Sequence, residues 1–262
     1  MDMERSILVN FSHSRHEHPS QEGFFRHIHE EYELLYFVEG DAEYVIESAV
    51  YRLKKGDLLL IKPRAYHYLK LLTPSPYERF VINFKTDGLP TETVEFLQSA
   101  KELYSLPDDS FIHSLFREWK TREKDFSQET NEFFAQNVLG AVLTLLKAIP
   151  NAKSVKPEKL HDTLKAIMAY IENEPTAKIC IPEVAEKFFV SPSWIVHTFQ
   201  KELGISFSQY VGKKKMLYAK QLLTSGLTPT QAAEQCGFFE YSTFYRQYKK
   251  HWGTSPKEDV KR

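Results

Sequence analysis

The spacing of hydrophobic residues changes along the chain, from alternation in the first third to helical spacing in the rest. Up to about residue 85, short apolar stretches are separated by polar turns, as at 33–38, 42–47, 58–61 and 77–84. Stretches of this length and pattern predict β-strands. Several short strands broken by polar turns favour a small barrel or jelly roll.

Helical spacing takes over between Thr91 and Ile149. A helix over 131–147 would cover the barrel, hold two chains together, or do both. The next residues, 150–157, begin and end with proline and are mostly polar between them, which predicts a short linker. The apolar residues that recur on one face of the predicted helix are Phe134, Val138, Ala141, Val142 and Leu145.

The C-terminal part contains the same pattern twice, at 181–204 and 228–253. In each copy a short helix with a central alanine precedes a tight turn and a longer helix that ends at glycine. This is the pattern of a helix-turn-helix. Between the copies, Phe207–Ser225 predicts a helix of about 27 Å, at ~1.5 Å per residue. That length approaches one turn of DNA, about 34 Å, so one chain would present two recognition helices to it.

Local residues support both copies. Pro182 and Pro229 fall where a first-turn proline is tolerated, and Ser191 and Ser242 are predicted N-caps. The apolar residues predicted to form the two small cores are Val184, Ala185, Phe188, Ile195 and Phe199, and then Ala232, Ala233, Phe244 and Tyr248.

Together these patterns predict an α+β protein of two domains. Residues 1–90 form the barrel, 91–149 form its covering or dimerisation helices, and 150–157 form the linker. Residues 158–262 form an all-α domain in which a long helix joins the two helix-turn-helix motifs.

Charge separates the two halves of this 262-residue chain, although the formal net charge is only −1. Residues 151–262 hold 17 Lys and Arg against 11 Asp and Glu, a net of +6, whereas residues 1–150 hold 17 against 24, a net of −7. Only the C-terminal half has the charge of a phosphate binder. Two cysteines, the absence of a long apolar run and an N-terminus unlike a signal peptide favour the reducing cytoplasm, with no membrane partner.

Six short motifs lie between His161 and Pro256: Ala185-Glu-Lys-Phe188, Ser191-Pro-Ser-Trp194, Phe199-Gln-Lys-Glu-Leu-Gly204, Ala219-Lys-Gln-Leu-Leu223, Ala232-Ala-Glu-Gln-Cys-Gly-Phe238 and Phe244-Tyr-Arg-Gln-Tyr-Lys-Lys-His-Trp-Gly253. With these motifs the segment resembles the DNA-binding domain of the AraC family of bacterial transcription regulators. The resemblance implies a single-chain unit whose two helix-turn-helix motifs enter successive major-groove segments of double-stranded DNA.

The resemblance also implies which residues face DNA. Arg246 is the strongest candidate for a base contact, because a guanidinium pairs bidentately with guanine. His197 stands where a longer basic or amide side chain is common, so the first copy is expected to discriminate bases less than the second. Candidate base contacts are Ser193, Val196 and His197 in the first copy and Tyr241, Ser242, Tyr245 and Arg246 in the second; Lys201, Lys249, Lys250 and His251 are candidate phosphate contacts.

A second pattern lies in the predicted barrel: Gly23-x3-His27-Ile-His29-x3-Glu33-x6-Gly40, then Gly56-x6-Pro63-x3-His67. It resembles the cupin motifs, in which two histidines, a glutamate and a later histidine can bind a divalent metal. The glycine usual in the second motif is missing, with Ala65 near its place. Regulators of the AraC family commonly keep a cupin fold without a metal, so we expect no cofactor. Metal on these four residues is the alternative.

As an effector site, the barrel would offer the hydrogen-bonding groups of His27, His29, Glu33 and His67, which suit a small polar molecule such as a sugar. The histidine-rich start of the chain, with His13, His16 and His18, is expected to be a flexible polar arm. In the family such an arm can fold over the effector, so Arg15 is a further candidate contact.

The sequence therefore predicts a ligand-responsive, sequence-specific transcription regulator. The family resemblance implies a homodimer that activates transcription through RNA polymerase. The chain carries no P-loop, dinucleotide motif or Ser/His/Asp pattern, so no catalytic residue is expected and the protein is not predicted to be an enzyme. The alternative is a metal-dependent cupin enzyme or a metal sensor fused to a DNA-binding domain.

Overall fold

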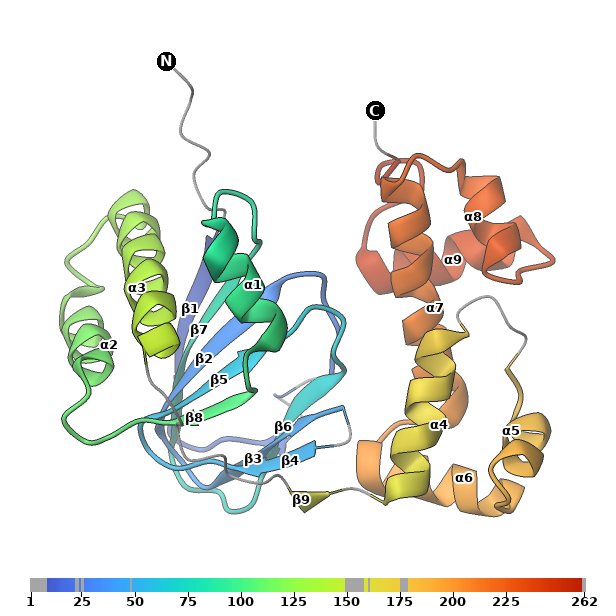
Figure 1. Ribbon diagram of the computed structural model, residues 1–262, viewed down its shortest axis with the longest axis horizontal. Helices are drawn as coiled ribbons and strands as arrows, with labels where there is room; N and C mark the ends of the chain where they lie inside the picture. Colours follow the sequence, from blue (N-terminus) through green and yellow to red (C-terminus); the bar gives the residue numbers. More distant parts are fainter. Residues whose placement is uncertain are drawn as a thin grey trace. The chain divides into compact units, whose positions relative to one another are not determined.

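The computed structural model describes residues 9–21, 24, 26–47, 49–148, 158–159, 161–174 and 179–260. The chain divides into two compact units, Met1–Glu158 and Lys159–Arg262 (Figure 1). The predicted linker 150–157 and Gly23 of the cupin-like pattern lie outside the described residues. Within the described residues, no helix is long and apolar enough to span a membrane.

The first unit contains two antiparallel sheets, and the strands predicted from alternation are confirmed as β2, β3, β5 and β7. Four further strands, β1, β4, β6 and β8, lacked a clear sequence pattern, as did the two-residue β9. The larger sheet has the order β1 (Val9–His16), β7 (Tyr77–Phe84), β2 (Tyr32–Glu39), β5 (Asp57–Ile61) and β8 (Leu103–Ser105). The smaller has the order β6 (His67–Leu71), β3 (Ala42–Ile46), β4 (Ala49–Arg52) and β9 (Glu158–Lys159).

Successive residues of the larger sheet face opposite sides, because side chains alternate along a strand. On β2, Leu35 and Phe37 join the core between the sheets, together with Tyr44 and Tyr77. Tyr36, between them, belongs to a different core beneath the helices. The first unit is thus a barrel-like sandwich with one face covered by helices, and both faces of its larger sheet are buried.

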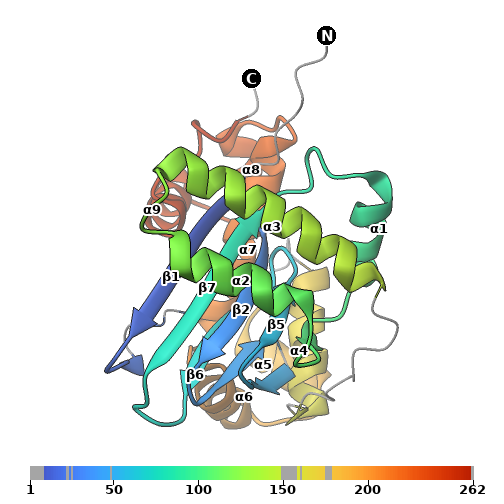
Figure 2. The same cartoon turned by 90° about the vertical axis from the view of Figure 1, so that its left-hand side faces the viewer.

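Three helices follow: α1 (Thr91–Ser99), α2 (Phe111–Arg122) and α3 (Gln128–Ala148). Helices α2 and α3 lie across the outer face of the larger sheet (Figure 2). Val138 and Val142 are buried there as predicted, whereas Ala141 is only partly buried. The covering role of this helix is therefore confirmed, and a role in holding two chains together stays a prediction.

The expectation of a flexible N-terminal arm is wrong for His13 and His16, because both lie in β1, which pairs with β7 along its whole length. The polar residues of this strand hide its alternation. Phe11 packs against Trp119 of α2 with ring centroids 5.0 Å apart, and His13 stacks on Phe80 at 4.1 Å. Alternate side chains of β1 therefore insert under the helices.

The carboxylate of Glu78 is fully buried and ties β1 and α2 to β7. Burial alone would raise the pKa of Glu78, but hydrogen bonds from Lys120, His13 and Arg15 outweigh burial and hold this pKa below its usual value. A carboxyl group with a lowered folded-state pKa stabilises the fold above its unfolded-state pKa, about 4.3, and loses this contribution as pH falls further.

We expect Glu78→Gln to lower the free energy of unfolding by about 2 kcal/mol at pH 7, because it removes the one buried negative charge that His13, Arg15 and Lys120 share. At pH 3 the difference from the wild type should shrink. Urea denaturation at both pH values measures this. Glu118→Gln is the control: its pair with Arg122 is about 60% exposed on both sides, so its loss should cost under ~0.5 kcal/mol. Equal effects of the two changes would contradict the prediction.

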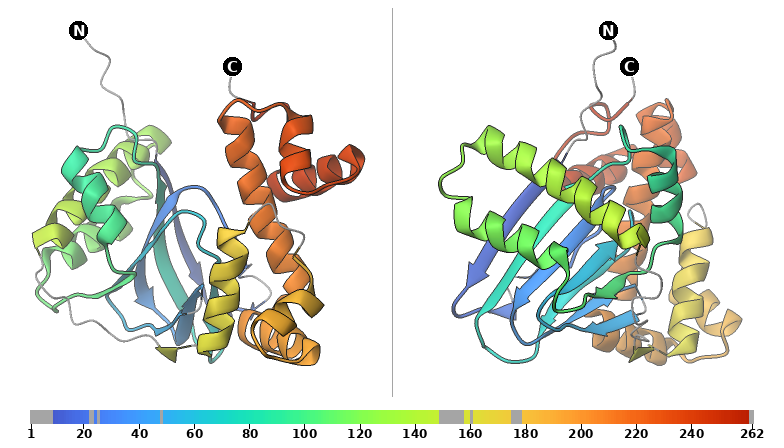
Figure 3. Two further views of the ribbon diagram at one scale, coloured as in Figure 1. Left: turned by 45° about the vertical axis from the view of Figure 1, so that its right-hand side comes forward. Right: turned by 60° about the vertical axis from the view of Figure 1, so that its left-hand side comes forward.

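The second unit is all helical, with α7 as its spine (Figure 3). The elements are α4 (Asp162–Asn173), α5 (Ile181–Lys187), α6 (Pro192–Thr198), a π-helical turn (Phe199–Leu203), α7 (Phe207–Thr224), α8 (Pro229–Gln235) and α9 (Tyr241–Trp252). The pairs α5–α6 and α8–α9 are the two helix-turn-helix motifs. Their predicted core residues are buried, except Phe188, which is half-buried.

Most of the predicted capping residues are confirmed. Gly204 and Gly253 adopt left-handed conformations at the helix ends, and the Ser191 hydroxyl accepts a hydrogen bond from the Trp194 amide. The prediction for Ser242 is wrong: the N-cap is Glu240, two residues earlier, and α9 already begins at Tyr241. Glu240 makes no side-chain cap hydrogen bond, so no hydroxyl residue marks this helix start in the sequence.

The two turns carry exposed phenylalanines in different backbone conformations. Phe189 is 95% exposed and has a φ of 54°, a region that costs a bulky L-residue about 1–2 kcal/mol. Phe239 is 97% exposed, and the left-handed position of its turn is taken by Gly237 instead.

We expect Phe189→Gly to raise the free energy of unfolding by about 1 kcal/mol, because glycine adopts this conformation without strain. The matched change Phe239→Gly relieves no strain and should lower the free energy of unfolding by about 0.5 kcal/mol through backbone entropy. Denaturant unfolding of both variants measures the difference, and a loss of stability in Phe189→Gly would show that the left-handed conformation carries no cost here.

Candidate nucleic-acid interface and ligand site

The candidate DNA contacts of the first copy lie on α6 and the π-helical turn that continues it. Ser193, Val196 and His197 are all exposed, whereas Ile195 between them is fully buried. This alternation follows from the helical period, which turns Ile195 to the core and leaves the others on the opposite side. Lys201, in the π-helical turn, is 82% exposed and contacts only its neighbour Glu202 among the ion pairs of the described residues.

In the second copy, α9 presents Tyr241, Ser242, Tyr245 and Arg246 on its exposed side, while Phe244 and Tyr248 are buried. The Arg246 guanidinium lies along its own helix: Nε donates to the Ser242 carbonyl at 3.3 Å, and Nη2 lies 3.5 Å from the Thr243 hydroxyl. Both contacts are long, and Arg246 meets no carboxylate within the described residues. The guanidinium can therefore turn outward to a base edge.

Two of the three candidate phosphate contacts on α9, Lys249 and Lys250, are exposed in its last turn. The third, His251, is half-buried beside Trp252, with ring centroids 4.6 Å apart. Burial and the neighbouring charges of Lys213 and Lys220 lower the pKa of His251 to about 4. A neutral imidazole still has one N–H that can donate to a phosphate oxygen, so this contact stays a prediction.

Helix α7 sets the distance between the copies. Its 18 residues correspond to about 27 Å at ~1.5 Å per residue, which agrees with the predicted spacer. Its start is fixed by a capping box between Ser206 and Gln209, and α8 begins with a second box between Thr228 and Gln231. These boxes, which define where each helix begins, were not recognised in the sequence although both have a hydroxyl residue followed by glutamine three positions later.

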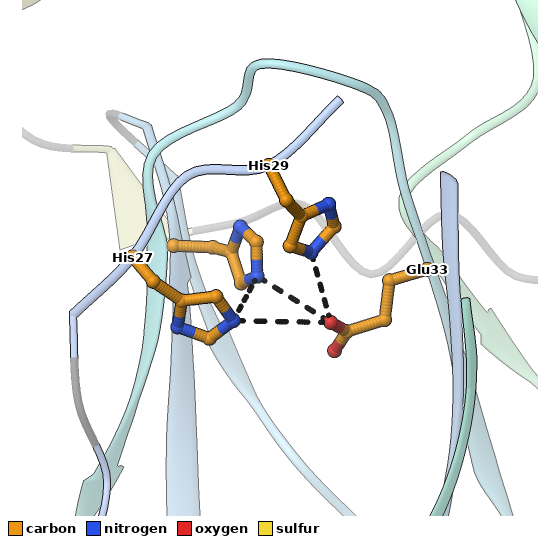
Figure 4. A group of neighbouring side chains, drawn as sticks. His27, His29 and Glu33 are labelled. Atoms are coloured by element: carbon orange, nitrogen blue, oxygen red, sulfur yellow. Dashed lines mark hydrogen bonds and ion pairs between the residues drawn. The ribbon is translucent and has the colours of Figure 1, made fainter. Parts of the chain in front are cut away.

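In the first unit, the structure brings His27, His29, Glu33 and His67 together on the inner side of the barrel. One nitrogen or oxygen from each residue lies within 4.8 Å of the others. Figure 4 shows the side chains of His27, His29 and Glu33 converging. Three short distances define the cluster: His29 Nε2 to Glu33 Oε2, 3.2 Å; His67 Nε2 to Glu33 Oε2, 3.5 Å; and His67 Nε2 to His27 Nε2, 3.0 Å.

Backbone carbonyls orient two of these imidazoles. Nδ1 of His29 donates to the carbonyl of Glu31 at 2.9 Å, and Nδ1 of His67 donates to that of Ala65 at 2.8 Å. A carbonyl only accepts, so Nδ1 carries the proton, and Nε2 of a neutral ring presents a lone pair to Glu33. A lone pair facing a carboxylate requires a positive charge between them, either a proton or a metal ion.

The carboxylate of Glu33 is buried, with its side chain 5% exposed. Burial alone would raise the pKa of Glu33, but hydrogen bonds to His29 and His67 outweigh it and hold the pKa well below its usual value. The hydroxyl of Tyr44 donates to Oε1 at 3.1 Å, which leaves Oε2 facing the histidines. Sequence reasoning missed Tyr44, although the alternation of 42–47 places it on the same face as Ala42 and Ile46.

The four residues fit a metal ion in size and chemistry. Ligand atoms about 2.1 Å from a tetrahedral ion lie roughly 3.4 Å apart. The three short distances above are close to this value, whereas His27 Nε2 lies 4.0 Å from Glu33 Oε2 and the largest separation is within 4.8 Å. Three neutral imidazoles and one carboxylate suit Zn²⁺, Fe²⁺, Mn²⁺ or Ni²⁺. The carbonyls behind His29 and His67 and the hydroxyl behind Glu33 are the outer partners that such ligands usually have.

Arg15 is not part of this cluster. Its guanidinium donates to Glu17 at 2.7 Å and to Glu78 at 2.8 Å, and Glu78 contacts Lys120 of α2. These contacts place Arg15 on the helix-covered side of the larger sheet, whereas Glu33 faces the barrel core. The residues predicted to surround one effector thus divide between two sides of one sheet.

Known proteins resemble the chain over both units. A family model described as a helix-turn-helix domain matches residues 184–262, and one described as an AraC-like ligand binding domain matches residues 12–131. YfiF of Bacillus subtilis (strain 168), an uncharacterized HTH-type transcriptional regulator, is 25% identical over 247 residues, which cover 88% of this chain and 76% of YfiF. LumQ of Photobacterium leiognathi, a probable transcriptional regulator, is 27% identical over 232 residues, covering 88% and 89%.

Solved structures resemble the chain more distantly. The crystal structure of ToxT from Vibrio cholerae O395 aligns with 98% of this chain and 97% of its own, at 15% identity and a TM-score of 0.42.

Proposed function

Because the chain belongs to the AraC family of transcription regulators, with a DNA-binding and a ligand-binding domain, we propose that occupancy of the His27–His29–Glu33–His67 cluster controls binding to a two-part operator. The observation that carries this proposal is the convergence of four ligand atoms within 4.8 Å inside the ligand-binding domain. Control requires that the occupant bind the DNA-competent state more tightly than the other state.

The two exposed helices α6 and α9 support a two-part operator. Each is the second helix of its motif, and each exposes the candidate base contacts on the side away from its core. With α7 between them, one chain would read two half-sites about one helical turn apart. The exposed guanidinium of Arg246 and the shorter His197 support a greater share of base discrimination by the second copy.

The occupant is either a small polar molecule such as a sugar or a single divalent metal ion. The hydrogen-bonding groups of the cluster support a sugar. Sugars are also common effectors of AraC-family regulators. The short separations of the ligand atoms favour a metal ion, because they leave space for one ion between them. The second candidate function is therefore a metal-responsive regulator.

The family resemblance, rather than a contact within this structure, supports three further proposals. The chain works in the cytoplasm as a homodimer, and it activates transcription by contacting RNA polymerase. One feature of α3 supports the dimer: its outer side exposes a large apolar side chain, Phe133, which is 67% exposed and could pack against a second chain.

Selection of bound sequences from a random double-stranded DNA library tests the proposed function. The selection is run at a fixed salt concentration with the protein as purified, after chelation, and with Zn²⁺ restored. We expect a motif of two half-sites about one helical turn apart, recovered more strongly in one of the metal states. Recovery of sequence-independent DNA alone in every state would overturn the proposal.

A further inference from the structure

The exposed apolar side chains of the protein are concentrated in the two helix-turn-helix motifs. Within the part of the chain that the structure describes, five of the eight exposed large apolar side chains belong to these motifs. Apolar side chains that gather on one surface mark a site of contact with another molecule. Two of the five, Val196 of α6 and Tyr245 of α9, lie on the helices that carry the candidate base contacts and are 47% and 36% exposed.

The buried residues of the two motifs show which exposed positions correspond. Each copy buries two apolar residues four positions apart: Ile195 and Phe199 in the first copy, and Phe244 and Tyr248 in the second. When these buried pairs are aligned, Val196 corresponds to Tyr245, and the next position holds His197 in one copy and Arg246 in the other. Both copies therefore present an exposed apolar side chain directly before the basic one.

An apolar side chain in the major groove can recognise one kind of base. Thymine has a methyl group on its major-groove edge, whereas the other three bases present hydrogen-bond donors and acceptors there. The side chain of Val196 has no hydrogen-bonding group, and that of Tyr245 has one only at the far end of its ring. Removing these apolar surfaces from water against a methyl group is favourable, whereas packing them on a donor or acceptor leaves it unpaired.

A methyl contact matters most for α6, because this helix offers little else that distinguishes bases. The hydroxyl of Ser193 both donates and accepts hydrogen bonds, so it suits several bases. His197 cannot make the two parallel hydrogen bonds by which a guanidinium recognises guanine. Without Val196, α6 would contribute affinity for DNA but little preference among bases.

We propose that Val196 and Tyr245 each read the methyl group of a thymine, so that each half-site of the operator contains one thymine whose methyl group strengthens binding. In the half-site read by α9, this thymine lies near the base pair read by Arg246, the next residue. The inference rests on the proposed function, because it requires that α6 and α9 both enter the major groove.

The test replaces the thymines of the selected operator by deoxyuridine, one at a time, which removes only the methyl group. Fluorescence anisotropy of labelled DNA measures the affinity of the full-length protein at a fixed salt concentration. We expect one thymine in each half-site to lose about fourfold in affinity on replacement, the value of one buried methyl group, and the two replacements together to lose about 16-fold. Replacing thymines outside the half-sites should leave the affinity unchanged.

Protein variants assign each methyl group to its side chain. Val196→Ser should remove the effect of deoxyuridine in one half-site and keep it in the other, and Tyr245→Ser should do the reverse. Val196→Ile and Tyr245→Phe are the matched controls, because they keep an apolar surface and should therefore keep both effects. Both positions are exposed, so these changes should leave the fold intact.

Two results would overturn this inference and leave the proposed function standing. One is an operator that binds equally well with deoxyuridine at every thymine of its half-sites. The other is an effect of deoxyuridine that persists in both Val196→Ser and Tyr245→Ser, since other groups would then read the methyl groups. Failure to recover any sequence-specific operator would instead overturn the proposed function, and this inference with it.

Discussion

Replacing Arg246 by alanine should weaken operator binding about 10- to 100-fold, and it should abolish the preference for one base pair in the half-site read by α9. A bidentate contact to guanine contributes about 1–3 kcal/mol of discrimination. Arg246 is exposed on the side of α9 away from its core, and its guanidinium makes long contacts to Ser242 and Thr243. Replacing His197, the counterpart on α6, should cost less, because a single imidazole contact discriminates less.

Binding measurements on the selected operator and on single-base variants separate these effects. Arg246→Lys keeps the charge but removes the bidentate geometry, so it should recover affinity for all sequences without restoring base preference. Lys249→Ala should lower affinity uniformly and reduce the salt slope by about one. Gln247→Ala, on an exposed position beside Arg246, is the matched control. A larger loss of selectivity in His197→Ala than in Arg246→Ala would reverse the assignment of the two copies.

The helical unit was more predictable from its sequence than the sheet unit, and the reason is physical. Helical contacts are local, so apolar spacing, Pro182 and Gly204 suffice to mark α5 and the end of the π-helical turn. In the sheets, β2, β5 and β7 could be predicted from the sequence, because their apolar residues either form a continuous run, buried on both faces, or alternate clearly with polar residues. Strand β1 was not visible, because its inward residues include His13, which packs as an aromatic ring on Phe80.

The same difference applies to the candidate sites. The four residues of the histidine cluster could be predicted together, because a recognisable spacing links them before any pairing of strands is known. Arg15 could not be placed, because its side of the sheet depends on the register of β1 with β7. Nothing in the sequence indicated that Tyr36 stacks on Phe116, since β2 and α2 meet only after the helices cover the sheet.

The cluster itself leads to the second prediction: the chain should bind about one Zn²⁺ ion, and His27→Ala should weaken this binding roughly 100-fold. His27 is suited to the test because its side chain is 43% exposed at the rim, so its removal leaves no buried cavity. Glu33→Gln should weaken binding at least as much, because it removes the only anionic ligand among the four. His18→Ala removes an exposed histidine outside the cluster and should change nothing.

Tyr44→Phe separates a metal site from a hydrogen-bonded cluster that binds no metal. The lost hydroxyl donates to Glu33 Oε1 at 3.1 Å, so a metal site should lose about tenfold in affinity while its stoichiometry stays the same. Metal should also stabilise the protein, by about 2.7 kcal/mol at 100 times the dissociation constant, and this gain should vanish in Glu33→Gln. Metal content after dialysis, titration calorimetry and thermal unfolding give three independent measurements. If the wild type retains no metal, the cluster is held by protons instead, and a polar organic effector becomes the better occupant. If the wild type and His27→Ala bind metal equally tightly, His27 is not a ligand.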